Sequence, residues 1–372
     1  MARSRSAVNG RSGSTTATPL GAAQPIATES VLDGRWLLLG KDMRLTAYTR
    51  TRGGLLRWTE ARPGGPEWQG PEFIPTPGVD DISVAQGANK YVHFFGRRAG
   101  GMGRGQALEI VHAIQYQTGR PLTEWTSVGN PYKQPEKAAL VGAPVGAVST
   151  SGTVHVFVRN AGGGVTMRCE GERGGWLPWR DIRGNKAKDG LAAVVLGSGR
   201  IELLVPGDGP AMHWCQTQGD GDMERRPNIH IAPAPNSAIA VETGPDRVTF
   251  YWTDLVTGSV HAHRPGSWVI PMGASPAAGR HAALRALIDG YDCTVLAHCG
   301  VDGEVMLAGC VTENEQAGVW WSPTGERSAH QPALARDARG LLVLAVIGSK
   351  GELRIARQQR GQGLALEAAR TV

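Results

Sequence analysis

Basic side chains gather in two runs of this chain where a ligand could bind. Arg97, Arg98 and Arg104 lie in a glycine-rich run, and Tyr132 and Lys133 lie in a second run that is rich in Pro and Lys. Both runs have the composition of loops, and long loops often carry function in a protein whose other connections are short. We therefore predict that these residues form the basic rim of a ligand-binding site. The alternative interpretation is a disordered, solvated Gly/Arg loop.

Two tryptophans indicate a second kind of binding chemistry. Trp176 and Trp320 lie just before tryptophans that recur along the chain, and Arg168 and Glu313 lie near them. Exposed aromatic faces suit the apolar C–H surface of a sugar, while Arg and Glu side chains supply hydrogen bonds. We therefore predict that Trp176 and Trp320 contact a ligand of this kind. The alternative is that each indole caps the end of a hairpin.

Signatures of enzymes and of metal sites are weak in this sequence. The chain contains no GxSxG, Walker A or HExxH sequence, and no Ser-x-Asp-x-Gly-x-x-Trp box. His261 and His263 are two residues apart and would face the same side of a strand, but a third ligand is lacking. We expect no cofactor and no metal, and the sequence identifies no catalytic residue.

Composition narrows the classes of partner. The 372 residues carry a net charge of +6 that is spread thinly, so we expect no nucleic-acid partner. Residues 1–25 are rich in Ser, Thr, Gly and Ala and lack the apolar core of a signal peptide, which predicts a disordered leader. No stretch approaches the roughly 20 apolar residues of a membrane span. We expect a cytoplasmic protein that binds a small molecule or a sugar and no membrane; its oligomeric state stays open.

A repeat of near-constant length organises the chain and must position these residues. Each repeat has a β-rich run, then a second and a third run joined by a turn with glycine, then a loop that closes on Trp in all repeats but the fourth and the seventh. The second runs begin at Arg44, Lys90, Thr153, Arg200, Arg247, Asp292 and Gly340. Neighbouring starts lie 45 to 48 residues apart, except for one interval of 63. This period predicts an all-β fold, a seven-bladed β-propeller of four-stranded antiparallel blades, with residues 26–372 as its single domain.

Residue types assign each strand a place in its blade. The innermost strands, such as 145–148 and 192–195, are rich in Ala, Gly and Val because space is scarce near the axis. The outermost strands start near recurring tryptophans, which are Trp68, Trp125, Trp179, Trp268 and Trp321. We predict that these indoles wedge between neighbouring blades. The last blade is completed either by 364–368 or by a strand from 26–31.

Alternating strand direction divides the loops between two faces. Connections from second to third strand, and from a fourth strand to the next blade, share one face. The enlarged segments 97–105 and 131–138 therefore lie side by side on that face, whereas Trp176 and Trp320 lie on the other. Charged residues on or beside the innermost strands would line the central channel if they turn inward; they are Asp80, Asp81, Glu242, Arg285 and Arg336.

One repeat resembles a known family. Residues 154–182 contain Val-His-Val-Phe-Val-Arg-Asn and then Gly-Trp-Leu-Pro-Trp-Arg-Asp-Ile, and the second strands of blades 2 and 5 are similar. This pattern resembles the W-motif repeats of bacterial seven-bladed lectins of the Photorhabdus type. The resemblance covers about residues 35–370, and it implies fucose-type sugar binding in pockets between blades. It is mostly a resemblance of scaffold, and a fold is poor evidence of function.

Two functions are favoured at this point, and a protein–protein scaffold stays open as a third, as it does for any propeller. The resemblance and the extra tryptophans favour a lectin-like propeller that binds a carbohydrate or a similar small ligand. The glycines and tryptophans repeat from blade to blade but the polar residues do not, which counts against many equal sites. The alternative is a single-site, cofactor-free biosynthetic enzyme that cyclises or rearranges a small molecule at one mouth of the channel, near blades 2 and 3.

Overall fold

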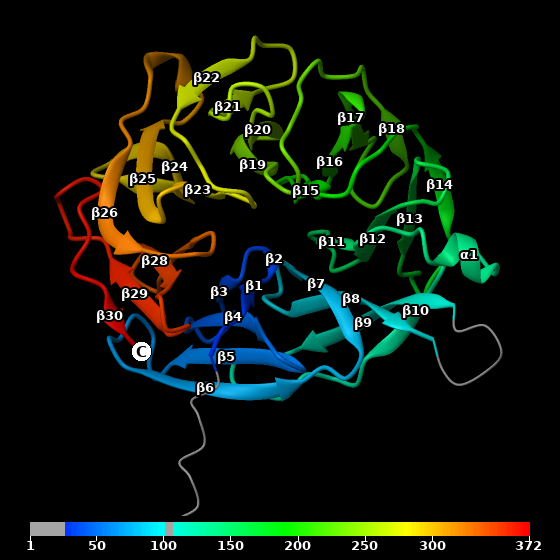
Figure 1. Ribbon diagram of the computed structural model, residues 1–372, viewed down its shortest axis with the longest axis horizontal. Coiled ribbons are helices and arrows are strands. Elements are labelled where there is room, and N and C mark those ends of the chain that lie inside the picture. Colours follow the sequence, from blue (N-terminus) through cyan, green and yellow to red (C-terminus); the bar gives the residue numbers. More distant parts are fainter. Residues whose placement is uncertain (1–26, 101–106) are drawn as a thin grey trace, which may run out of the picture.

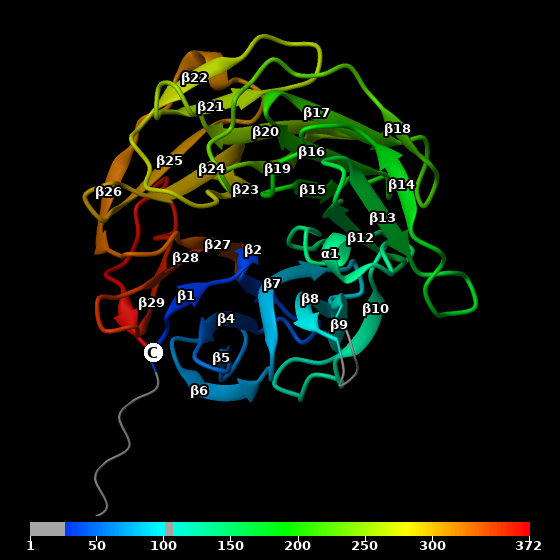
Figure 2. The ribbon, with the colours of Figure 1, turned by 45° about the vertical axis from the view of Figure 1, so that its right-hand side comes forward.

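The repeats fold into a ring of sheets around a central axis (Figure 1). A computed structural model describes residues 27–100 and 107–372, and in this part of the chain the strands form seven sheets. From the third sheet onwards each sheet holds four consecutive antiparallel strands in chain order (Figure 2). The protein is therefore a seven-bladed β-propeller, as the repeat predicts. The predicted leader, 1–25, and Arg104 lie outside the described residues.

Four main strands build each blade, and they run in chain order from the axis outwards. Blade 1 contains β3 (Leu37–Leu39), β4 (Leu45–Thr51), β5 (Gly54–Glu60) and β6 (Trp68–Pro75). Blade 2 contains β7 (Val79–Gln86), β8 (Val92–Ala99), β9 (Leu108–Gln115) and β10 (Thr126–Gly129). Blade 3 contains β11 (Val145–Val148), β12 (Val154–Arg159), β13 (Val165–Cys169) and β14 (Arg180–Arg183). Blade 4 contains β15 (Ala192–Val195), β16 (Ile201–Gly207), β17 (Gly209–Gln216) and β18 (Met223–Arg225).

The remaining three blades follow the same plan. Blade 5 contains β19 (Ile239–Gly244), β20 (Arg247–Thr253), β21 (Val260–His263) and β22 (Ile270–Gly273). Blade 6 contains β23 (Ala282–Ile288), β24 (Tyr291–Cys299), β25 (Glu304–Val311) and β26 (Ser322–Arg327). Blade 7 contains β27 (Ala333–Arg336), β28 (Leu342–Ile347), β29 (Leu353–Arg357) and β30 (Arg370–Thr371). The loops hold α1 (Pro135–Ala138) and the 3-10 helix η1 (Glu315–Ala317), and among the described residues no helix has the length and apolar character needed to cross a membrane.

Small residues allow the innermost strands to approach the axis and their neighbours. β11 reads Val-Gly-Ala-Val, and a Cβ on its Gly146 would lie 2.1 Å from the ring of Phe95 in blade 2. Close packing leaves no room for such an atom without a shift of the ring. Glycine at 146 is therefore required by packing between blades 2 and 3.

Most of the recurring tryptophans pack between blades as predicted, but one does not. Those that are partly buried against a core cluster are Trp68, Trp125, Trp179 and Trp321. The Trp321 indole N–H donates to the carbonyl of Met272 in blade 5 (2.8 Å). Trp268 has 89% of its surface exposed, so the prediction that it wedges between blades is wrong.

The offset of Trp268 from its strand explains this difference. β10, β14 and β26 each begin one residue after their tryptophan, whereas β22 begins two residues after Trp268. Val269 therefore takes the place directly before the strand that tryptophan takes in those three blades, and Trp268 lies one residue further out in the loop. The indole of Trp268 consequently faces solvent.

The C-terminal segment completes blade 7. Arg370 and Thr371 pair with β29, and an isolated bridge joins Gln358 to Leu366. The strand thus lies slightly beyond the predicted 364–368. The N-terminal segment does not add a strand to blade 7, because β1 (Ser30–Val31) pairs with β4 of blade 1.

The N-terminal segment nevertheless connects three blades. β1 and β3 both pair with β4, and between them the chain leaves the sheet so that β2 (Asp33–Gly34) pairs in parallel with β7 of blade 2. The backbone N–H of Thr28 donates to the carbonyl of Gly351 in blade 7 (3.2 Å). One core cluster accordingly contains residues of blades 7, 1 and 2.

The loops divide between two faces as the strand directions require. We call the face with the connections from first to second and from third to fourth strands the 1–2 face, and the opposite one the 4–1 face. Residues at the ends of the enlarged segments lie close together on the 4–1 face. Nη1 of Arg97 donates to the carbonyl of Val141, which follows the second segment (2.9 Å), and Nδ2 of Asn130, which precedes it, donates to the carbonyl of Leu108 at the start of β9 (2.7 Å).

Candidate functional site

The predicted basic rim on the 4–1 face is largely neutralised by acidic neighbours. Arg97 forms an ion pair with Asp81, and Arg98 pairs with Glu109 (2.8 Å). Tyr132 is partly buried against the core cluster of blades 2 and 3. Of the described members of the rim, Lys133 alone is exposed without an ion pair. The structure brings these residues to one face, but their use as a ligand site stays a prediction.

Trp176 is held within the scaffold. The backbone of Trp176 forms a β-bridge with that of Glu170. The indole of Trp176 packs edge-on against His112, with ring centres 5.6 Å apart. It is partly buried in the same cluster as Tyr132. This position suits the interpretation of a hairpin cap better than that of a ligand platform.

Trp320 projects into solvent on the 1–2 face. Its side chain is 90% exposed, while the next residue, Trp321, packs between blades 5 and 6 and stacks edge-on against His298. Trp268 lies in the equivalent loop of blade 5 and is exposed to the same degree. Both residues lie in connections from a third to a fourth strand. The 1–2 face thus presents two solvated indoles from adjacent blades.

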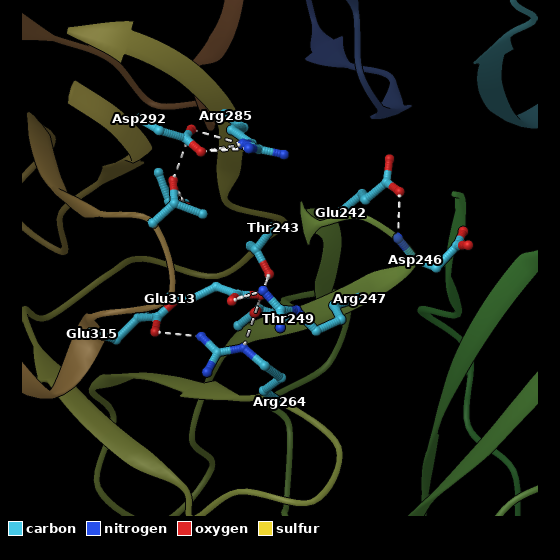
Figure 3. A network of polar contacts seen from close by, with 12 residues as sticks. Glu242, Thr243, Asp246, Arg247, Thr249, Arg264, Arg285, Asp292, Glu313 and Glu315 are labelled. Carbon is cyan, nitrogen blue, oxygen red and sulfur yellow. Dashed lines mark hydrogen bonds and ion pairs between the residues drawn. The ribbon is translucent and has the colours of Figure 1, made fainter. Parts of the chain in front are cut away.

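A polar network ties these two loops together (Figure 3). Arg264 directly follows β21 in blade 5, and its Nη2 donates to Oε2 of Glu315 in the loop of blade 6 (2.7 Å). Its Nε lies 3.6 Å from Oε1 of Glu313. Arg247 also pairs with Glu313, and Thr243 donates to the same carboxylate (3.2 Å). The carboxylates of blade 6 therefore anchor its loop to blade 5.

The residues of this network range from fully buried to mostly exposed. Glu315 is fully buried and accepts a hydrogen bond from the hydroxyl of Tyr251 (2.8 Å). Burial, followed by the charge of Glu315, raises the pKa of Tyr251 well above its usual value, so the phenol stays a donor. Arg247 lies at the rim, with 59% of its side chain exposed. The Nε of Arg264 is a buried donor without a hydrogen-bond partner among the described residues.

The two halves of this site differ in how well sequence reasoning could find them. Trp320 and Glu313 were both predicted, because they stand beside a recurring tryptophan. Trp268 was interpreted as scaffold, and the extra residue before β22 is the signal that would have corrected this. Arg264 carries no local signal, since its partners lie about 50 residues away in the next blade.

The central channel contains two cavities. A cavity of about 350 Å³ opens on the 4–1 face, and one of about 940 Å³ opens on the 1–2 face. Glu242, Arg285 and Arg336 line the larger cavity, and Asp81 lines the smaller. These predicted residues therefore turn inward. Asp80 is exposed and pairs with Arg50 (3.3 Å).

A groove of about 520 Å³ lies between blades 4 and 5 on the 4–1 face. Trp252 lines it but is fully buried, and its indole nitrogen has no hydrogen-bond partner among the described residues. His261 packs edge-on against this indole, with ring centres 5.7 Å apart. His261 and His263 do not extend to a metal site: within residues 27–100 and 107–372, no group of three or more His, Cys, Asp or Glu side chains could hold an ion.

Comparisons with known proteins return propellers of more than one activity. No protein-family model matches the chain, and no curated protein matches it. The solved structure of AofleA from Arthrobotrys oligospora aligns at 14% identity over 78% of this chain and 86% of that chain, with a TM-score of 0.49. The fucose-specific lectin from Aleuria aurantia aligns at 13% identity over 78% and 95%, with a TM-score of 0.48.

A sialidase appears beside these proteins. A mutant of the NanB sialidase from Streptococcus pneumoniae aligns at 12% identity over 91% of this chain and 70% of that chain, with a TM-score of 0.46. Likeness at this level does not assign an activity to the present chain. Membership of the Photorhabdus-type lectins stays a resemblance.

Proposed function

We propose that this protein binds a carbohydrate on the 1–2 face, between blades 5 and 6. The exposure of Trp320 carries the proposal, because a solvated indole on a loop whose neighbouring residues are anchored is an unusual use of a large apolar side chain. Trp321 and Glu315 hold the loop on either side of it. The loop thus presents the ring from a fixed base.

The chemistry around Trp320 suits a polyhydroxylated ligand. Indole faces pack against the apolar C–H surface of a pyranose, and Trp268 supplies a second such ring from blade 5. Arg247 and Glu313 at the rim offer hydrogen-bond donors and acceptors to sugar hydroxyls. The ion pairs of Arg264 with Glu313 and Glu315 hold both loops in place. The ligand would bind with the indoles at its edge and the ion pairs beneath it.

A single site accounts for the sequence better than a ring of equal sites. The blades share glycines and tryptophans but differ in polar residues, so the Arg264–Glu315 pair arises from residues particular to blades 5 and 6. The enzyme alternative near blades 2 and 3 has no observation in its favour, and a cytoplasmic location stays a prediction.

Binding to a glycan array, followed by calorimetry on the best ligand, tests the proposal. We expect Trp320→Ala to weaken binding at least about 10-fold, since about 1.4 kcal/mol of stacking corresponds to that factor. The matched control is Val256→Ala, which removes an exposed apolar side chain from the 4–1 face. Absence of glycan binding by the wild type at about 1 mM, or unchanged affinity of Trp320→Ala, would refute it.

A further inference from the structure

The two channel cavities adjoin inside the ring, and we call the region that they share the waist. Five residues line both cavities, and they come from different parts of the ring: Arg35, Ser83, Ile239, Arg280 and Leu334. Around them the walls are formed by the Ala-, Val- and Leu-rich innermost strands. The waist therefore places guanidinium groups inside a passage with apolar walls.

Arg35 occupies this waist because of the detour of the N-terminal segment. The chain leaves blade 1 after β1, pairs through β2 with blade 2, and returns at β3, so Arg35 lies at the turn between β2 and β3. Its side chain is accessible to channel water, yet it is enclosed by the ring. Among residues whose side chains are described, Arg35 has no hydrogen bond or ion pair. It is a cation that lines both cavities and has no acidic partner among the described side chains.

Other basic groups extend from the waist toward the 1–2 face. Arg336 and Lys90 line the larger cavity, are exposed to it, and have no ion pair among the described side chains. Arg280 differs, since it is held at the waist and donates to the carbonyls of Ala238 and Leu191. The cavity thus presents at least three cations, Arg35, Arg336 and Lys90, from three blades or their connections.

The acidic groups of the same cavity are engaged elsewhere. Glu242 accepts hydrogen bonds from the backbone N–H groups of Gly197 (2.8 Å) and Asp246 (3.1 Å), as Figure 3 shows in part. Asp292 binds Arg285 (2.7 Å), and this pairing lowers the pKa of Asp292 and raises that of Arg285. Both carboxylates are therefore satisfied at the mouth and do not pair with Arg35 or Arg336.

From this arrangement we propose that the channel binds a small organic anion, whose phosphate or carboxylate group lies between Arg35 and Arg336. Cations that line the channel without an ion pair among the described side chains repel one another, and an anion that pairs with them removes this cost. Arginine is the side chain best suited to a planar, bidentate bond with either oxyanion. This site is separate from the indoles and does not depend on the carbohydrate site.

The shape of the channel indicates how much of the ligand lies beyond its anionic group. The larger cavity, about 940 Å³, is of the size that encloses a drug-sized molecule, and its mouth carries Lys90. Apolar strands on its wall suit a hydrocarbon or aromatic body. The smaller cavity, about 350 Å³, leaves room for water on the far side of the waist. The ligand therefore enters from the 1–2 face with its charged end first.

The protonation behaviour of Arg35 agrees with this geometry. Burial within the ring, followed by the charge of Arg336, lowers the pKa of Arg35 from its ordinary value. A bound anion would oppose both effects.

Calorimetric titration of the full chain with phenyl phosphate, benzoate and inorganic phosphate tests the proposal at about 20 mM salt, where charge interactions are weakly screened. We expect saturable binding of at least one organic anion, stronger than that of inorganic phosphate. Arg35→Gln and Arg336→Gln should each weaken it at least about 10-fold. The matched control, Arg52→Gln, removes the same charge from an exposed turn and should bind as the wild type does.

A second measurement separates this role from a structural one. Without ligand, Arg35→Gln should melt at the same or a higher temperature than the wild type, because it removes an uncompensated charge. With phenyl phosphate, the wild type and Arg52→Gln should gain stability and Arg35→Gln should not. No saturable binding by the wild type, or equal affinities for wild type and Arg35→Gln, would overturn the proposal. Equal affinity for inorganic and organic anions would contradict the part assigned to the apolar wall.

Discussion

Arg357 of blade 7 donates a hydrogen bond to Glu60 of blade 1, although 297 residues separate them in the chain. The same guanidinium donates to Asp337 (2.9 Å) and to the carbonyl of Gly65 (2.8 Å). Glu60 in turn accepts from the backbone N–H of Leu45 (2.8 Å). Since the described strands include none that is exchanged between the first and last blades, this buried network and the core beside it close the ring.

Removing one partner of this network should destabilise the whole propeller. We expect Arg357→Met to lower the free energy of unfolding by about 3–5 kcal/mol, because Glu60 would remain buried without its ion-pair partner and Asp337 would keep only Arg339. Urea denaturation followed by tryptophan fluorescence measures this change. Arg180→Gln is the matched control, since it breaks an exposed pair with Asp222, and its effect should stay within about 1 kcal/mol. Equal effects of the two variants would contradict the assigned role.

Packing at the axis gives a second prediction. Gly146→Ala should lower the free energy of unfolding by about 1–3 kcal/mol, because the added methyl group meets the buried ring of Phe95. Gly162→Ala, in an open turn of the same blade, is the control and should change stability little. Thermal unfolding compares the two. A neutral Gly146→Ala would mean that blades 2 and 3 can separate without cost.

Truncation of the adjacent tryptophans Trp320 and Trp321 should affect the stability of the fold very differently. Trp321→Ala should cost about 3 kcal/mol of stability, because this indole packs between blades 5 and 6 and donates to Met272. Trp320→Ala should change stability by less than about 0.5 kcal/mol, as its ring is solvated. Denaturation midpoints of both variants check this. Loss of stability in Trp320→Ala would undermine its use as a binding surface.

Buried histidines should make the fold sensitive to acid. His93 and His112 lie side by side with ring nitrogens 3.0 Å apart, and burial lowers the pKa of His93 to about 4 and that of His112 to about 3. In the unfolded chain both titrate near 6.5, so the unfolded state binds more protons. Stability should therefore be full above about pH 6.5 and fall steadily as the pH drops toward 4.

The size of this effect can be measured. One histidine with a pKa near 4 in the folded state costs about 2 kcal/mol at pH 5, relative to neutral pH. Denaturation midpoints between about pH 7 and pH 5 should show a slope that His93→Gln reduces. The control His230→Gln alters an exposed side chain and should leave the slope unchanged. A flat profile in the wild type would show that these rings are not buried in solution.

The fold was predictable because its information is local and repeated. Glycine turns, small inner-strand residues and a tryptophan at the outer strand recur in several blades, so each copy supports the interpretation of the others. Trp268 departs from this pattern because β22 begins two residues after it. The recurrence of Trp in the sequence does not show at which residue the next strand begins. Ring closure was ambiguous because a two-residue strand such as β30 has no periodicity to detect.

The residues of the candidate sites were predictable only where they lie close in sequence to a recurring residue of the repeat. Trp320 and Glu313 were found through their neighbour Trp321. Arg264 and Glu315 were missed, since their bond joins loops of two blades. Arg35 was missed because the detour of the chain between β1 and β3 carries it to the axis, and nothing in a short stretch of sequence indicates such a detour.

That detour also determines how the protein would respond to tension. A pull on the N-terminus acts on Thr28, β1 and β2, which bond to blades 7, 1 and 2 respectively. The load is therefore shared across the seam of the ring instead of peeling one edge strand. A cargo attached at that end would thus have to break bonds to three blades before the segment could detach from the ring.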